Sequence, residues 1–436
     1  MLLIYSKPVP NRLKYIARLL LTELFGIETE FTENPDVFES FSGPKINYSN
    51  RQMSRGLHIL PAPLLFGTGV VESPVDIERR GEEVFLFPSR GGAFPFDPFA
   101  ASFYLVSRYE EYENSQKDKY GRFDPAQSLA RIHGFLDRPV VNQWARMLAD
   151  RLREMFPGLT LAEPSYRYTP TIDVDHAFAY RSRTVFRTLG GIGRSISRAE
   201  FGKVADRLMV ISGFRDDPYD TFAYIRKFHA GLDLSPLFFI LYADYGGKDN
   251  NVTLRKKRFR RLLATLADER APGIHPSLSS NRSPGRLENE INGLSAVTGR
   301  EITASRQHFL KFSFPRTFRH LVTYGITDDY SMGYASDCGF RAGIASPFRF
   351  FDLYRNEITP LVIHPVAAMD VTFRDYRHLG PPEAAALIRQ LADRVRAVNG
   401  EFVSLWHNES LSEQGRWKGW RNIFEETTAY AAGLQQ

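Results

Sequence analysis

The second half of the chain alternates between short apolar runs and longer segments with apolar residues at helical spacing. The run Ser235–Asp244 (SPLFFILYAD) is almost continuously apolar, which is typical of a strand buried on both faces. A helical segment then precedes GIHPS, and the same exchange of strand and helix recurs up to EFVSLWHNES. This alternation predicts a parallel (β/α) barrel over residues 165–436.

Residues 1–160 have a different pattern. Short strands (LLIYS, KINYS, LHILPA and EEVFLF) are punctuated by Pro and Gly, a helix is expected over Asn11–Phe25, and two longer helical segments follow the strands. Asp97 stands before Pro98 at the opening of the first of these two, which favours a helix start. We expect a smaller α/β domain here, joined to the barrel through Pro157–Pro164. The segment SRYEEY is either a docking surface or a solvated helix end, and we favour the second.

Polar side chains recur at the C-terminal ends of the predicted barrel strands. In a parallel barrel these ends form one mouth, where active sites are built. Scattered surface residues would not share this placement, so we predict a single site at the mouth. The residues so placed are Asp173, Asp175, Asp244, His275, Arg306, His308, Asp328, His364 and His407.

The stretch TIDVDH brings two carboxylates, Asp173 and Asp175, to the end of the first barrel strand. In an extended chain this spacing points both side chains the same way, and close like charges need compensation by a metal or an arginine. Such a pair can also be only a cap or part of a salt-bridge network. With remote histidines, however, one carboxylate can bind Zn²⁺ or a similar ion, while the other acts as a general base.

The composition of the chain narrows the class of protein and the kind of partner that can be expected. The formal net charge is +6 and 43% of the residues are hydrophobic, so the chain is globular and its modest positive excess does not argue for nucleic acid. A single cysteine, Cys338, excludes an internal disulfide and suits a reducing compartment. No apolar run reaches the roughly 18 residues that a membrane span needs, and Lys and Arg interrupt the N-terminal segment. We expect a soluble, cytoplasmic protein without a transmembrane segment.

A basic segment, Arg181–Lys203, follows the first barrel strand as an insertion with one acidic residue and a glycine break. Three interpretations stay open: a site for an anionic substrate, contact with a membrane surface, or an ordinary loop-helix excursion. In the first case Arg181, Arg183 and Arg187 would contact the diphosphate of a carrier-linked sugar.

A series of motifs in residues 165–436 resembles the polysaccharide deacetylases, carbohydrate esterases whose domain is an irregular (β/α) barrel. The segments that carry the resemblance are TIDVD, APGIHPSLS, SRQHF, GITDDYSMGYASDCGFRAGIASPFRFFDL and SLWHNES, in this order. The resemblance is greatest to a bacterial subgroup with an additional N-terminal domain of unassigned function, which residues 1–160 resemble through FPFDPFAASFYLVSRYEEY and KYGRF.

This resemblance implies a metal-dependent hydrolase, with zinc the most expected ion, that removes acetyl groups from an N-acetylated sugar or a carrier-linked glycan. The roles that it implies are catalytic for Asp173 (base), Arg306 (orienting the base) and His407 (acid), and metal-binding for Asp175 and His275. To substrate binding we assign His308, His176, Trp406 and Tyr334. His308 is the alternative acid, and the two aromatic residues could simply pack.

One position departs from the family's pattern. The usual second motif is His-x-x-x-His, whereas this chain has His275 and Ser279. A serine hydroxyl is a poor zinc ligand, so the third ligand is open, and His176 and His308 are the nearest candidates. Two other functions therefore stay in view: a non-catalytic carbohydrate-binding module with a degenerate metal site, and an amidohydrolase acting on a non-sugar amide.

Overall fold

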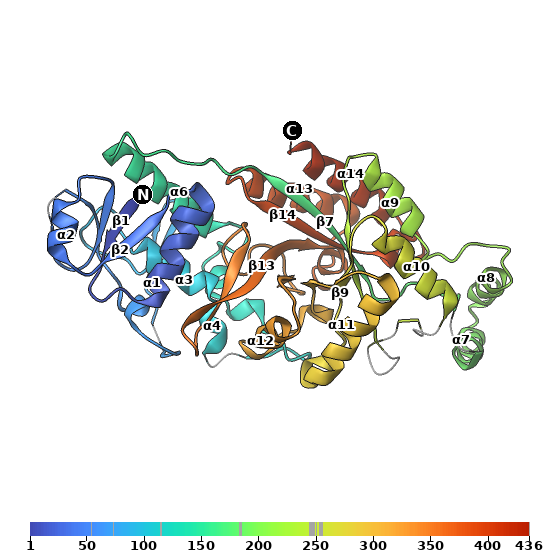
Figure 1. Ribbon diagram of the computed structural model, residues 1–436. Coiled ribbons are helices and arrows are strands. Elements are labelled where there is room, and N and C mark those ends of the chain that lie inside the picture. Colours follow the sequence, from blue (N-terminus) through green and yellow to red (C-terminus); the bar gives the residue numbers. More distant parts are fainter. Residues whose placement is uncertain are drawn as a thin grey trace.

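The computed structural model describes residues 1–53, 55–72, 74–113, 116–182, 185–243, 249, 251–252 and 256–435. The chain forms a smaller N-terminal part and a larger C-terminal part that lie side by side (Figure 1). Three residues named above, Asp244, Arg183 and the side chain of Arg187, lie outside the described residues.

The N-terminal part is built on a four-stranded parallel sheet in the order β2-β1-β3-β4, with a separate antiparallel pair, β5 and β6. The strands are β1 (Leu2–Tyr5), β2 (Thr29–Thr32), β3 (Lys45–Tyr48), β4 (Leu57–Ile59), β5 (Ile77–Arg80) and β6 (Glu83–Leu86). The helices are α1 (Asn11–Ala17), continued by a π-helical turn (Arg18–Glu23), α2 (Pro35–Ser40), α3 (Pro98–Val106), α4 (Tyr109–Tyr112), α5 (Leu129–Ile132) and α6 (Val140–Met155).

The segment SRYEEY is not a solvated helix end, and that prediction is wrong. Arg108 has a left-handed backbone (φ 55°) that separates α3 from the short α4. Its buried guanidinium donates to Glu110 and Glu111, and Glu111 in turn accepts from Arg341 of the C-terminal part at 2.6 Å. Burial alone would raise the pKa of Glu111, but Arg341 and Arg108 lower it to about 2. The segment therefore fastens the two parts to each other.

The C-terminal part is a curled, largely parallel sheet with helices outside it. The pairing order is β11-β10-β9-β8-β7-β14-β13-β12, and the sheet curls until β11 also pairs with β13. Only β12 runs antiparallel to its neighbour. The strands are β7 (Arg167–Val174), β8 (Leu237–Ile240), β9 (Gly273–Ile274), β10 (Ala304–Ser305), β11 (Asp328–Met332), β12 (Phe348–Asp352), β13 (Glu357–Met369) and β14 (Glu401–His407). The predicted α/β class is confirmed, and in place of a regular parallel barrel the strands form this curled, mixed sheet.

Helices precede or follow these strands as the alternation predicts. They are α7 (Val185–Ser197), α8 (Phe201–Ile211), α9 (Phe222–Ala230), α10 (Lys257–Ala267), α11 (Pro284–Thr298), α12 (Arg316–Thr323), α13 (Pro381–Arg396) and α14 (Trp420–Gly433). Within the described ranges none of the helices has the length and apolar character needed to cross a bilayer.

The apolar segment GFRAGIASPF (residues 339–348) favours a strand, but β12 begins only at Phe348. The preceding residues instead run along the N-terminal part. The carbonyl of Gly343 accepts from the N–H of Val141 at 2.9 Å, and Asn142 accepts from the N–H of Ala345 at 2.9 Å. Contacts with another part of the molecule thus replace sheet pairing here.

Two polar residues assigned to the mouth lie at the other end of the sheet. Asp328 opens β11 instead of following it, and His364 lies in the middle of the long β13. Nδ1 of His364 is 2.7 Å from Glu401, at the start of β14, and Nε2 is 3.0 Å from Asp328. The ring stacks on Tyr330, with centroids 4.2 Å apart. His364 is therefore a structural histidine and not a residue of the mouth.

This buried cluster predicts a pH-dependent stability. Burial alone would lower the pKa of His364, but Asp328 and Glu401 raise it to about 9. The stabilisation of the folded state by protonated His364 is then complete below the pKa of about 6.5 that the histidine has in the unfolded chain. It is lost as the pH rises through about 9. The difference in unfolding free energy between wild type and His364→Gln should shrink by on the order of 3 kcal/mol from about pH 6 to about pH 10. Denaturant titration measures it, and a difference that stays constant would contradict the assignment. His378→Gln, at an exposed histidine, is the control.

Candidate metal centre

Neighbouring strands bring most of the predicted site residues to one end of the sheet. Asp173 and Asp175 end and follow β7, His275 follows β9, and Arg306 and His308 follow β10. His407 ends β14, where it is paired in register with Asp173. Parallel strands therefore place side chains from four segments, far apart in the sequence, around one space.

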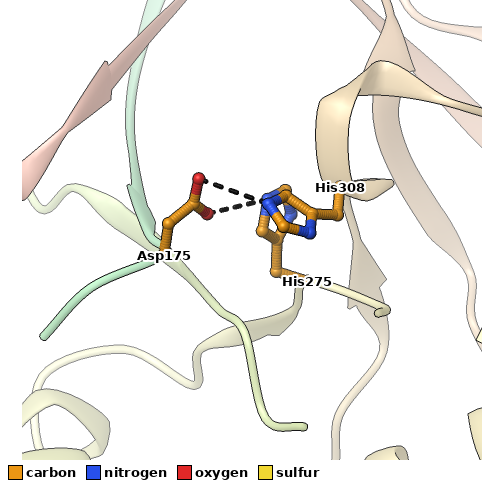
Figure 2. Close-up of side chains that lie close together, drawn as sticks. All are labelled: Asp175, His275 and His308. Atoms are coloured by element: carbon orange, nitrogen blue, oxygen red, sulfur yellow. Dashed lines mark ion pairs between the residues drawn. The ribbon is translucent and has the colours of Figure 1, made fainter. Parts of the chain in front are cut away.

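Asp175, His275 and His308 form a compact group (Figure 2). Nε2 of His275 lies 3.2 Å from Oδ1 of Asp175, and Nε2 of His308 lies 3.4 Å from Oδ2. One possible ligand atom from each residue lies within 4.8 Å of the others. Figure 2 shows both imidazoles directed at the carboxylate. One carboxylate and two imidazoles are a donor set suited to zinc or a similar divalent ion.

The hydrogen bonds on the far side of each ring support this fit. Nδ1 of His275 lies 2.5 Å from the carbonyl oxygen of Arg306, which can only accept, so Nδ1 carries the proton. Nδ1 of His308 faces Oδ1 of Asp249 at 2.9 Å in the same way. The neutral form of each ring then points a lone pair on Nε2 at Asp175, whose buried Oδ1 has no hydrogen-bond partner within the described part of the chain. A cation between the three groups would satisfy all of them.

The charges in this group are strongly coupled. Burial alone would lower the pKa of His308, but Asp175 and Asp249 raise it to about 9. Burial would likewise raise the pKa of Asp175, yet His308 and His275 hold it well below its ordinary value. A proton on His308 and a divalent cation are alternative ways to neutralise Asp175, so metal binding is expected to release a proton.

Asp173 stands beside this group and is held by an arginine. Nη1 of the fully buried Arg306 lies 2.8 Å from Oδ1 of Asp173 and also donates to Thr171. The bidentate clamp expected of an arginine that orients a carboxylate base is not formed, because Nε of Arg306 donates instead to the carbonyl of Tyr330 and Nη2 has no hydrogen-bond partner among the described residues. Oδ2 of Asp173 stays on the side of the metal group, 3.7 Å from Nε2 of His275.

His407 faces the same space from β14. Its Nδ1 lies 2.8 Å from Oδ1 of Asp370, and its backbone N–H donates to Oδ2 of Asp370 at 2.8 Å. Nε2 is 3.8 Å from Oδ2 of Asp175. Burial alone would lower the pKa of His407, but Asp370 and, more weakly, Asp175 and Asp173 raise it to about 10. The imidazole is thus protonated at neutral pH and able to donate.

These side chains line a pocket of about 210 Å³. Its lining includes Asp173, Asp175, His176, His275, His308, His407, Glu409 and Arg122. His176 is partly exposed there, with Nδ1 3.0 Å from Oε2 of Glu409. Two residues assigned to substrate binding do not line it. Trp406 points to the opposite face of β14 and packs edge-on against Phe424, with centroids 5.3 Å apart. Tyr334 is buried between the two parts, where its hydroxyl accepts from Arg108 at 3.1 Å.

Ser279 lies just outside the metal group. Residues 275–279 are not helical, so Ser279 does not share a helical face with His275. Its hydroxyl donates to Oδ2 of Asp249 at 3.3 Å, and Asp249 in turn contacts His308. The nitrogen that this segment lacks can therefore come from His308, which belongs to a different segment.

Residues of three segments complete the site without having been assigned to it from the sequence. Asp370 follows β13 directly, so the same strand-end rule could have found it. Asp249 lies in a connection that carries no such signal. Arg122, in the KYGRF segment of the N-terminal part, donates to the carbonyl of Phe309 at 3.0 Å and pairs with Asp118 at 2.6 Å. The N-terminal part thus contributes Arg122 to the lining of the pocket.

Comparison with known proteins gives three findings. Residues 2–157 match a family described as "Family of unknown function (DUF7033)". None of the curated proteins compared with the chain matches it. Two solved structures, both provisionally described as polysaccharide deacetylases, are similar to part of it. The Mycobacterium smegmatis protein has a TM-score of 0.39 and 15% identity, over 62% of this chain and 84% of that one. The Pseudomonas aeruginosa protein has a TM-score of 0.32 and 10% identity, over 47% of this chain and 64% of that one.

Proposed function

We propose that this protein is a metal-dependent hydrolase that removes acetyl groups from an N-acetylated sugar or glycan intermediate, on a barrel of the polysaccharide deacetylase type. The observation that carries the proposal is the convergence of Nε2 of His275 and Nε2 of His308 on Asp175, beside the arginine-held Asp173 and with His407 in the same pocket. A metal ion, a general base and a general acid are the groups that metal-assisted hydrolysis of an amide requires. The order of the sequence motifs supports the same reaction.

Asp175, His275 and His308 would hold the ion. When bound, a divalent ion such as zinc would polarise the acetyl carbonyl and lower the pKa of a water molecule. Asp173 accepts the proton of the attacking water, and Arg306 holds its carboxylate in place through Oδ1. His407 donates its Nε2 proton to the leaving nitrogen as the C–N bond breaks, and Asp370 stabilises the imidazolium before that transfer. The products are acetate and the free amine.

Metal analysis together with acetate release tests this function. We expect the purified protein to hold one divalent ion per chain and to release acetate from an N-acetylated sugar, presented free or linked to a nucleotide or lipid diphosphate. Retained metal with no acetate from any sugar would favour hydrolysis of a non-sugar amide. Sugar binding without metal or acetate would favour a non-catalytic module.

The contact from the N-terminal part predicts a role for Arg122 in metal binding. Phe309 has a left-handed backbone (φ 61°), which is unfavourable for a side chain of its size, and it immediately follows His308. Arg122 holds its carbonyl, and the ring of Tyr120 stacks on Phe309 with centroids 5.5 Å apart. Arg122→Ala should therefore weaken zinc binding by about tenfold, the lower end for loss of a residue that orients a ligand.

Zinc titration of the metal-free protein measures this effect. Arg131→Ala is the matched control, because Arg131 belongs to the same part of the chain but its side chain is 58% exposed. Equal affinity in the Arg122→Ala and Arg131→Ala proteins would show that the N-terminal part does not position His308.

A further inference from the structure

Helices α7 and α8 form a hairpin, residues 185–211, that projects from the C-terminal part on the side away from the N-terminal part (Figure 1). Half of the large apolar side chains that lie exposed in the described residues belong to this hairpin and the turn after it. They are Leu189, Ile196, Phe201, Leu208, Met209, Ile211 and Phe214, with exposed fractions from 41% to 81%. Burying such side chains is favourable, so their concentration here indicates an interaction surface.

The exposed apolar residues form a stripe along each helix. Leu189 and Ile196 are seven residues apart on α7, and Phe201 and Leu208 have the same spacing on α8. Residues at this spacing lie on one face of a helix, and Ile211, three residues further, continues the second stripe. Phe214, in the turn after α8, is 81% exposed. Both helices are therefore amphipathic, with an apolar face that water covers in the isolated chain.

The charged residues of the same segment are mostly basic. Residues 188–215 contain five basic and two acidic residues. Arg194, Arg198 and Lys203 are exposed near the end of α7 and the start of α8. Amphipathic helices with Lys and Arg beside exposed Leu, Ile and Phe are typical of segments that lie in the headgroup region of an anionic membrane.

The base of the hairpin is fixed to the body of the protein. The carboxylate of the buried Asp217 accepts from the backbone N–H groups of Ala179, Tyr180 and Arg181 at 2.7 to 2.8 Å. Arg181 itself donates from its guanidinium to the carbonyls of Val210 and Arg215. This arginine therefore holds the hairpin in place, and its side chain is already engaged by the protein. The hairpin begins ten residues after Asp175, so it follows a residue of the pocket in the sequence.

We propose that the α7–α8 hairpin docks the protein on an anionic lipid bilayer, with the apolar stripes in the interface and the basic residues at the headgroups. Positive charge favours this occupant over a second copy of the chain, because two such hairpins would bring like charges together. Docking would bring the protein to a membrane surface, where a lipid-linked acetylamino sugar is accessible. The docking itself is independent of the proposed hydrolysis.

Co-sedimentation of the full chain with vesicles tests the proposal. We expect binding to vesicles of phosphatidylcholine with phosphatidylglycerol, weak binding to phosphatidylcholine alone, and a decrease as salt is raised. The variant Leu189→Ser/Phe201→Ser/Leu208→Ser should bind anionic vesicles on the order of a hundredfold more weakly, because three apolar side chains are lost from the interface. Val71→Ser/Ile132→Ser, at equally exposed apolar residues of the N-terminal part, should bind like wild type.

A charge variant keeps the test valid if the apolar variant fails to fold. Arg194→Glu/Arg198→Glu changes only exposed side chains and should lower binding to anionic vesicles by at least about tenfold. The proposal would be overturned if the full chain bound neither kind of vesicle, or bound both equally. A dimer in solution that Leu189→Ser/Phe201→Ser/Leu208→Ser dissociates, without vesicle binding, would assign the face to a second copy. None of these outcomes depends on acetate release, so a failure here leaves the proposed reaction to its own test.

Discussion

Asp173→Asn is expected to lower the rate of acetate release by at least about a thousandfold without changing the metal content. The amide keeps the oxygen that accepts from Nη1 of Arg306, so the geometry around the pocket is preserved. It cannot, however, take up the proton that the attacking water must lose. Because three other side chains form the metal group, the bound ion should be retained. Steady-state acetate release and metal analysis of the same preparation measure both effects.

A matched control for this prediction is Asp375→Asn, which also changes a carboxylate of the pocket lining to an amide. Asp375 faces Arg416 at 3.4 Å and belongs to neither the metal group nor its hydrogen-bond partners, so the rate should change by less than about threefold. Loss of metal in Asp173→Asn would mean that the roles of Asp173 and Asp175 are reversed. Full activity with retained metal would exclude Asp173 as the base.

The expectation that polar residues at the C-terminal ends of parallel strands share one site holds wherever the end of the strand is predicted correctly. It brought together Asp173, Asp175, His275, Arg306 and His407, because their strands are short or end where the apolar run ends. It failed at Asp328 and His364. β11 begins at Asp328, and β13 is thirteen residues long, so both residues are carried to the opposite end of the sheet. Hydrophobic alternation indicates that a strand is present, but it does not show how far pairing continues.

Other parts of the site depend on contacts that no local pattern reports. Asp249 reaches His308 from a connection 59 residues earlier, and Arg122 reaches Phe309 from the N-terminal part. Charged side chains are usually exposed, so the segment SRYEEY is expected to be solvated, yet Glu111 is buried against Arg341. From the sequence alone, two opposite charges that pair in the interior cannot be distinguished from two charges that are solvated, because only the fold shows that they are close together. For the same reason the sequence offered Tyr334 for the pocket, although the fold buries it between the two parts.

The second large effect is expected at the metal group. Asp175→Ala and His275→Ala should each weaken zinc binding by at least about a hundredfold, because each removes one of three converging donors. His308→Ala should have a similar effect if His308 supplies the nitrogen that Ser279 cannot. Titration of the metal-free proteins with zinc measures all three affinities.

His176→Ala is the matched control, since His176 lines the same pocket but contacts Glu409 instead of Asp175. It should leave zinc affinity unchanged while raising KM if His176 contacts the substrate. Loss of metal in His176→Ala with normal affinity in His308→Ala would move the third ligand to the opposite wall of the pocket. Ser279→His provides an independent check: the non-helical backbone of residues 275–279 does not place two imidazoles on one face, so the added histidine should not tighten zinc binding. Tighter binding in that variant would show that the segment can rearrange around the ion, and that the group of Asp175, His275 and His308 is not yet the complete ligand set.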